Sequence, residues 1–228
     1  MSYEIDIRDV NLEMKVPASK SVLHRQLIVN FLLQSVNGTL EPEVADLITT
    51  PLEGDNQDII ATRGCLKALY EAAAGICPTG DVILPCNESG STLRFMVPAA
   101  SAFLLRAGNS VNRRLVFETK GRLFDRPLSE LKDAMAPHGI DITKNESNRT
   151  IIVTGCMTPG KYTIDGSVSS QYISGLIMAL PMFNEESRID VTGGIKSVHY
   201  IELTENVLKK YGCGIKRVDD TYYPENNG

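Results

Sequence analysis

Several short segments of the chain combine hydroxyl side chains with cations or amides where helices are expected to begin. Residues 17–25 read PASKSVLHR and carry Lys20, Ser21 and Arg25. Ser21 and Arg25 are four residues apart and so share one helix face, with Lys20 one residue away. Because the first turn of a helix exposes unpaired N–H groups at the positive end of the peptide dipole, this segment favours an anion site.

The same chemistry recurs in ESGSTLR at 88–94 and in VSSQ at 168–171. Further donors stand near the starts of two other predicted helices. Beyond the first segment, the candidates are Ser89, Gly90, Ser91, Arg94, Arg126, Ser169, Ser170, Gln171, Ser197 and Tyr200. Any one serine alone is more often a helix cap than a ligand contact. Together, in an acidic chain, the clusters favour convergence on one polyoxygenated, phosphorylated molecule.

These segments lead into elements that must position them. Residues 20–36 have apolar side chains at helical spacing, with Ser19 as the expected N-cap. Alternating apolar residues predict strands within 3–16, and residues 37–54 are rich in turn-forming types. Further helices are predicted at 55–75, 86–108, 126–139, about 169–182 and 197–212, and further strands at 81–85, 113–121, 140–143, 150–155, 162–165 and 187–194. In the helix at 126–139, Pro127 is expected in the first turn and Gly139 at the C-cap.

The predicted elements repeat along the chain. The serine-led helices begin near residues 21, 91 and 169, and the helices that end in glycine begin near residues 58, 128 and 201. Both series therefore recur every 70 to 80 residues or so. This period predicts three copies of one α/β unit, at about 15–85, 86–155 and 156–228, with their helices packed together inside sheets.

Composition excludes several classes of function. With 228 residues, 43% hydrophobic composition and a net charge of -5, the chain can bury a core and has no broad nucleic-acid footprint. No apolar run approaches the roughly 20 residues of a membrane span. Five cysteines without a CxxC pair or a leader segment indicate reduced thiols in a cytoplasm, and three scattered histidines indicate no metal site. The P-loop-like segment 155–161 is followed by Tyr162 where a magnesium-binding Ser or Thr would stand.

Five segments, in order across nearly the whole chain, resemble the 5-enolpyruvylshikimate-3-phosphate synthase family. They are PASKSVLHR, ESGSTLRF, RLFDRPL, GSVSSQYISGLIMALP and SVHYIEL. The resemblance implies an inside-out α/β barrel-like domain of three βαβαββ units, one of two such domains in the family. It further implies a monomeric enzyme without a cofactor that transfers the enolpyruvyl group of phosphoenolpyruvate to the 5-hydroxyl of shikimate 3-phosphate.

The resemblance also implies roles for individual residues. Lys20 would be catalytic and contact both substrates. The other contacts to shikimate 3-phosphate would be Ser21 and Arg25 on the hydroxyls and carboxylate, Ser169, Ser170 and Ser197 on the 3-phosphate, Gln171 at the ring and Tyr200 against the shikimate moiety. Gly90, Arg126 and Gln171 would bind phosphoenolpyruvate, and Gly90 and Arg126 the herbicide glyphosate. A guanidinium such as Arg126 can grip a carboxylate or phosphate with two parallel hydrogen bonds.

The chain departs from the family pattern in sequence and in length. Glu88 replaces a frequent Asn, Phe95 replaces Pro, and SVHY replaces Ser-Lys-Pro-Tyr, which removes a lysine near the phosphate. The family is about twice as long, so the chain is expected to be an N-terminal half that lacks the C-terminal domain and is nearly inactive alone. Two alternatives remain: a noncatalytic binding domain of the same fold, and an enolpyruvyl transferase acting on UDP-N-acetylglucosamine.

Overall fold

The computed structural model describes residues 19–76, 80–106, 113–183 and 187–225, so the strands predicted within 3–16 lie outside the described residues. Seven α-helices are described, namely α1 (Lys20–Val36), α2 (Pro42–Thr49), α3 (Gln57–Ala73), α4 (Gly90–Arg106), α5 (Ser129–Met135), α6 (Ser170–Ala179) and α7 (Val198–Lys210). Short 3₁₀ turns, η1 (Ala136–His138) and η2 (Leu180–Met182), extend α5 and α6. Most helices of the sequence-based prediction are therefore present.

Within the described residues, eight strands form two sheets of identical topology. The strands are β1 (Val82–Asn87), β2 (Leu115–Thr119), β3 (Asp141–Asn145), β4 (Thr150–Thr154), β5 (Lys161–Asp165), β6 (Arg188–Thr192), β7 (Ile215–Val218) and β8 (Thr221–Pro224). The orders are β1-β2-β4-β3 and β5-β6-β8-β7, each with one parallel pair followed by antiparallel pairs. Residues 82–154 and 161–224 thus each read βαβαββ, the unit that the family resemblance implies. Residues 19–76 contribute helices to this pattern but no strand among the described residues.

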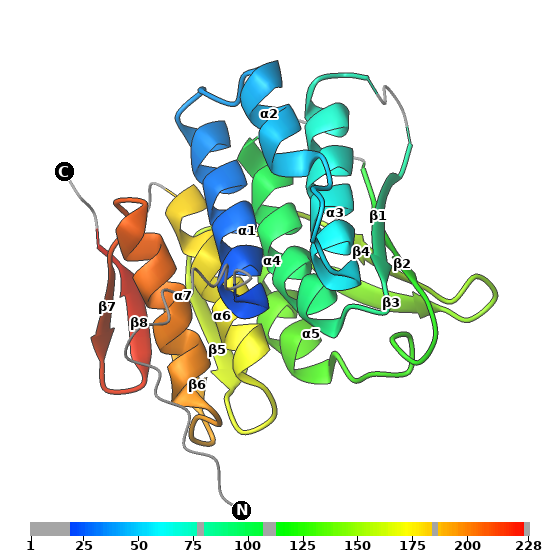
Figure 1. Ribbon diagram of the computed structural model, residues 1–228. Helices are drawn as coiled ribbons and strands as arrows, with labels where there is room; N and C mark the ends of the chain where they lie inside the picture. The colour runs from blue at the N-terminus through cyan, green and yellow to red at the C-terminus, as the bar shows by residue number, and fades with distance from the viewer. Residues whose placement is uncertain (1–18, 77–79, 107–112, 184–186, 226–228) are drawn as a thin grey trace, which may run out of the picture.

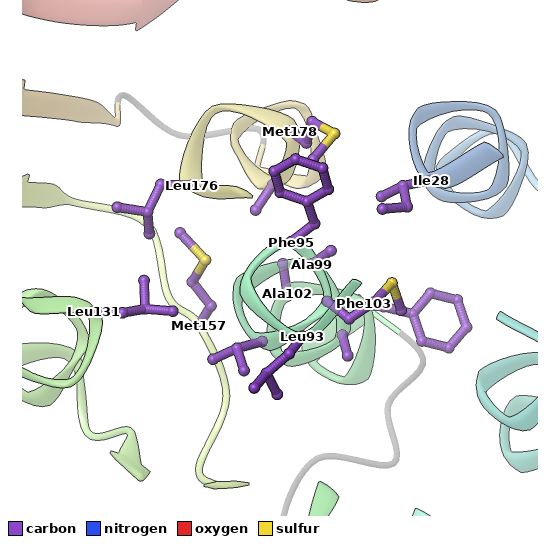
Figure 2. Packing of buried hydrophobic residues seen from close by; sticks show 14 of the residues in the cluster. Ile28, Leu93, Phe95, Ala99, Ala102, Phe103, Leu131, Met157, Leu176 and Met178 are labelled. Carbon is purple, nitrogen blue, oxygen red and sulfur yellow. The ribbon is translucent and has the colours of Figure 1, made fainter. Parts of the chain in front are cut away.

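The helices pack beside one another between the two sheets. Figure 1 shows α1, α3, α4, α6 and α7 side by side, with β1–β4 on the right of the view and β5–β8 on the left. Helix α4 is central and apolar on nearly all sides. In Figure 2 its Phe95 and Phe103 point in different directions, toward Met178 of α6 and away from it. Because almost every side chain of α4 is buried, its entrance is fixed rigidly within the core.

The close approach of α4 and α6 depends on a glycine. A Cβ added at Gly175 would lie 2.6 Å from the carbonyl oxygen of Arg94 and 3.0 Å from the side chain of Pro98. Only a residue without a side chain lets the two helix backbones come this near. The contact brings the entrances of α4 and α6 together.

Two local predictions were wrong. The turn-rich segment 37–54 contains helix α2, which begins at Pro42, and Pro is well suited to the first helical position because it has no N–H to satisfy. The helix predicted from residue 126 begins only at Ser129, so Pro127 precedes it. Its end agrees with the prediction, because Gly139 adopts a left-handed conformation with φ of 77°.

In the part of the chain that the structure describes, no helix is long and apolar enough to cross a membrane. The same described residues contain no group of three or more His, Cys, Asp or Glu side chains that could hold a metal ion.

Candidate functional site

The helix entrances singled out in the sequence converge on one cavity of about 420 Å³. Its lining comes from the N-terminal ends of α1, α4, α6 and α7 and from the loops before α6 and α7. The lining residues are Lys20, Ser21, His24, Arg25, Ser91, Phe95, Val168, Ser169, Ser170, Gln171, Lys196, Ser197 and Tyr200. All eight residues predicted to contact shikimate 3-phosphate are among them. Among the described residues, the lining holds three Lys or Arg side chains and no carboxylate.

Arg25 is a buried cation held by neutral groups. The residue is 2% exposed, and its guanidinium donates hydrogen bonds to Thr204 Oγ1 at 2.7 Å, the Ser21 carbonyl at 2.7 Å, the Tyr200 carbonyl at 3.0 Å and Ser174 Oγ at 3.3 Å. These bonds use four of its five N–H groups. Within the described residues it forms no ion pair, and burial lowers the pKa of Arg25 to about 10. A buried cation without a carboxylate partner is suited to receiving an anionic ligand.

Lys20 stands at the exposed mouth of the cavity. Its Nζ donates to Asp58 Oδ2 of α3 at 2.5 Å. Burial raises the pKa of the Asp58 carboxyl, but the hydrogen bond and charge of Lys20, followed by a hydrogen bond from Ser89, outweigh it and lower the pKa overall. The position of Asp58 is fixed by the helix start, because the side chain of Asn56 accepts hydrogen bonds from Asp58 N and Ile59 N. The entrance of α3 therefore orients the ammonium of Lys20.

His24 lies between these two cations on α1 and is uncharged at neutral pH. Its ring is 1% exposed, and burial lowers its pKa to about 4, with the charges of Lys20 and Arg25 acting in the same direction. Its Nδ1 forms a 3.0 Å hydrogen bond with Thr62 Oγ1. Thr62 Oγ1 in turn lies 2.8 Å from Thr92 Oγ1, which donates a 2.8 Å hydrogen bond to Ser89 Oγ. The buried Nε2 has no hydrogen-bond partner among the described residues.

Gly90 and Arg126, predicted to bind phosphoenolpyruvate, lie together beside the cavity although neither lines it. A Cβ at Gly90 would be 2.5 Å from Arg126 Nη1 and 3.3 Å from Arg94 Nη1. Arg94 Nη1 in turn donates to Gln171 Oε1 at 2.8 Å. The two arginines therefore crowd the entrance of α4 next to the amide of Gln171.

Glu88, whose replacement of Asn departs from the family pattern, is directed at the loop after β2. Its carboxylate occupies the space that a side chain at Gly121 would need, and Gly121 has a φ of +56°. Glu88 does not line the cavity.

The predicted phosphate contacts come from two adjoining loops. Ser169 caps α6 by accepting a hydrogen bond from Gln171 N, and Ser197 begins α7 with a left-handed backbone, φ 59° and ψ 54°. The loops touch at Gly166, where a Cβ would lie 2.5 Å from the carbonyl oxygen of Gly194. The missing side chain at residue 166 thus lets the two loops approach closely, and Ser169 and Ser197 line the same cavity.

Sequence reasoning missed several residues of the site. His24, Phe95, Val168 and Lys196 line the cavity. Three further residues position the cations of the site: Asp58 accepts a hydrogen bond from Lys20, and Thr204 and Ser174 accept hydrogen bonds from Arg25. Only Lys196 carried a local signal, since it directly precedes the predicted contact Ser197.

Comparison with known proteins identifies the family to which the chain belongs. The family model described as EPSP synthase (3-phosphoshikimate 1-carboxyvinyltransferase) matches residues 6–226. The 3-phosphoshikimate 1-carboxyvinyltransferase of Clostridium novyi (strain NT) is 30% identical over 226 residues, which cover 91% of this chain and 48% of that protein. The corresponding protein of Methanosphaera stadtmanae is 32% identical over 222 residues, which cover 96% and 50%.

Solved structures of EPSP synthase from Acinetobacter baumannii match with a TM-score of 0.60 and 17% identity, over 94% of this chain and 47% of theirs. This similarity confirms the predicted α/β fold. The chain spans about half the length of the curated relatives it matches. Because the family model covers nearly all of its residues, the chain belongs to the EPSP synthase (3-phosphoshikimate 1-carboxyvinyltransferase) family.

Proposed function

We propose that this chain forms the part of an EPSP synthase that binds shikimate 3-phosphate, during transfer of an enolpyruvyl group from phosphoenolpyruvate to the 5-hydroxyl. The observation that carries the proposal is the cavity, which gathers three cations and no carboxylate among the described residues of a chain with a net charge of -5. A phosphate and a carboxylate on one polyhydroxylated ring match that arrangement of ammonium, guanidinium and hydroxyl donors.

The proposed contacts follow the geometry of the cavity. Arg25, with one N–H left after its four protein bonds, and the neighbouring Ser21 bind the ring carboxylate and hydroxyls. Ser169, Ser170 and Ser197 donate to the phosphate, and Gln171 and Tyr200 contact the ring.

Phosphoenolpyruvate would lie beside Gly90 and Arg126, within reach of Lys20. The 5-hydroxyl oxygen attacks carbon 2 of phosphoenolpyruvate and loses its proton to a base, while an acid adds a proton to carbon 3. The tetrahedral intermediate then loses phosphate and a carbon-3 proton, which restores the double bond. We assign two roles to Lys20 in these steps, stabilisation of the developing negative charge and proton transfer, because its ammonium lies at the exposed side of the cavity.

We further propose that the 228 residues form one domain of three repeats, at about 15–85, 86–155 and 156–228. The remaining acid, base and arginine groups would come from a second domain of the full-length enzyme. The chain alone would then bind shikimate 3-phosphate as a cytoplasmic monomer and turn over substrate at a small fraction of the complete rate. General acid–base catalysis alone contributes about 10² to 10⁴ in rate.

Calorimetric titration with shikimate 3-phosphate tests this proposal. Binding by the wild-type chain that Arg25→Ala abolishes, while exposed Lys209→Ala leaves it unchanged, would support it. Binding of UDP-N-acetylglucosamine in preference to shikimate 3-phosphate would contradict it, as would no binding of either molecule. Addition of a complementing second domain should restore phosphate release; binding without such complementation would favour a noncatalytic domain.

A further inference from the structure

The three cations of the cavity differ in how far the protein already satisfies them. Lys20 is paired with Asp58, and Arg25 gives four hydrogen bonds to protein oxygens. The ammonium of Lys196 has neither a hydrogen bond nor an ion pair within the described residues. Lys196 is thus the one cation of the described cavity lining whose charge is free for a ligand.

The backbone places Lys196 beside the three serines of the cavity. Its N–H donates to the Gly166 carbonyl at 3.3 Å, which ties the loop before α7 to the loop before α6. Ser197 follows immediately and starts α7 in a left-handed conformation. Lys196 therefore lines the same cavity as Ser169, Ser170 and Ser197.

One carboxylate, Asp165, acts electrostatically on Lys196 without an ion pair among the described residues. Asp165, at the end of β5, accepts a hydrogen bond from Ser167 N at 2.8 Å. Hydrogen bonds from Ser167 lower the pKa of Asp165 most strongly, and the charge of Lys196 contributes less. Among the described residues Asp165 and Lys196 form no ion pair, so the charge of Lys196 acts on Asp165 only at a distance.

Serine hydroxyls can donate hydrogen bonds to a phosphate dianion, but they carry no positive charge to offset it, whereas an ammonium supplies both a charge-assisted hydrogen bond and a positive charge. A phosphate monoester carries a charge of about -1.5 to -2 at pH 7. The buried, unpartnered Nε2 of His24 in the same cavity is a second sign that a ligand completes this site.

We propose that Lys196 provides the ammonium that ion-pairs with the phosphate of the bound phosphate monoester, beside the three serine hydroxyls. The inference rests on the proposed function and deepens it. The segment SVHY at 197–200 has Val198 where the family pattern Ser-Lys-Pro-Tyr has a lysine, and we assign the missing positive charge to Lys196. Lys196 is thereby a residue that distinguishes a phosphorylated ligand from its unphosphorylated form.

The test compares two ligands that differ only in the phosphate, shikimate 3-phosphate and shikimate, titrated calorimetrically into the 228-residue chain. Lys196→Gln should weaken binding of shikimate 3-phosphate by about tenfold or more and change shikimate binding less than about twofold. Lys196→Arg should restore most of the affinity. Lys210→Gln, at the exposed end of α7, is the matched control and should bind both ligands as the wild type does.

The possible results separate this inference from the proposed function. Wild-type binding of shikimate 3-phosphate that Lys196→Gln leaves unchanged overturns the inference alone. Equal loss of both ligands in Lys196→Gln also overturns it, because the residue would then act on the ring or the fold. A wild-type chain that binds neither ligand overturns the proposed function and the inference together. A loss confined to the phosphorylated ligand supports both.

Discussion

Arg25 of α1 lies over the ring of Phe95 of α4, with its guanidinium carbon 4.9 Å from the ring centroid. The same ring forms an edge-to-face pair with His24, with the two ring centroids 6.2 Å apart. Phe95 is 1% exposed and lines the cavity, so it contributes a desolvated aromatic face beneath a buried cation. This contact orients Arg25 without neutralising it.

Phe95→Leu is expected to weaken binding of shikimate 3-phosphate by about threefold to tenfold, because a buried cation–π contact stabilises by up to about 2 kcal/mol. Phe103→Leu is the control. Phe103 also lies on α4 but packs against Phe31, 5.1 Å between centroids, outside the cavity lining. Both variants should lower the melting temperature, and only Phe95→Leu should change the dissociation constant. An equal loss of affinity in both would contradict the role of the ring.

Thr204→Val removes the hydroxyl that accepts the 2.7 Å hydrogen bond from Arg25 Nε. The substitution keeps the side-chain shape but leaves a buried N–H without its acceptor, which costs about 1–3 kcal/mol of unfolding free energy. Urea unfolding should show this loss. Exposed Thr143→Val on β3 should stay within about 0.5 kcal/mol of the wild type. A Thr204→Val chain as stable as Thr143→Val would show that Arg25 needs no acceptor there.

The stability of the fold should depend on pH through His24. Its pKa falls from 6.5 to about 4 in the folded chain, so the unfolded chain takes up the proton first as the pH drops. Stability is therefore lost between pH 6.5 and pH 4, by on the order of 3 kcal/mol. Urea midpoints across this range should fall for the wild type and for exposed His199→Asn. They should stay nearly flat for His24→Asn, and a slope that persists there would exclude His24 as its source.

The ion pair of Lys20 and Asp58 should make stability depend on pH in a lower range than His24 does. The pKa of Asp58 is lowered in the fold, so the stabilisation is fully present above the ordinary Asp value of about 3.9 and is lost as the pH falls through the folded value. Both side chains are partly exposed, 49% and 29%, so the contribution should not exceed about 1 kcal/mol. Asp58→Asn should lose little stability at pH 7 and should lack this acid-dependent component. Measurements at pH 5 and pH 3 distinguish it from the effect of His24.

Substitution of alanine for two glycines should affect the stability of the fold differently. Gly90→Ala meets the flexible ends of Arg126 and Arg94, which can shift, so its melting temperature should stay close to that of the wild type. Gly175→Ala meets the rigid backbone of α4 and should lose about 1–3 kcal/mol. Gly90→Ala should keep its affinity for shikimate 3-phosphate and bind glyphosate more weakly when the second domain is supplied. Unchanged glyphosate binding would contradict the placement of Arg126.

Local sequence signals were enough to predict the main helices and the convergence of their entrances. Serine clusters at 89–91 and 169–170 mark helix starts through capping chemistry, and apolar spacing marks the buried faces. Helix α2 was missed because Pro42 and the surrounding Asn, Gly and Thr residues resemble a turn, while the burial of Ala45 and Ile48 that stabilises it is tertiary.

The supporting groups of the site left no local pattern. Asp58 resembles an ordinary acidic residue in the first turn of a helix, although its carboxylate orients Lys20. Phe95 resembles core filler within an apolar helix, and its contact with Arg25 exists only once α1 and α4 are packed. Such contacts depend on the packing of whole helices, so a sequence pattern within one helix cannot reveal them.

The bonds of Arg25 to Ser174 and Thr204 join residues 149 and 179 positions apart in the chain. Closing loops of this length has an entropic cost that must be offset before the bonds form, so the anion site should be completed late in folding. Ligand binding then reports on the finished fold and reinforces it. At a free ligand concentration of one hundred times Kd, binding would add about 2.7 kcal/mol to the free energy of unfolding, spread across all three segments that meet at Arg25.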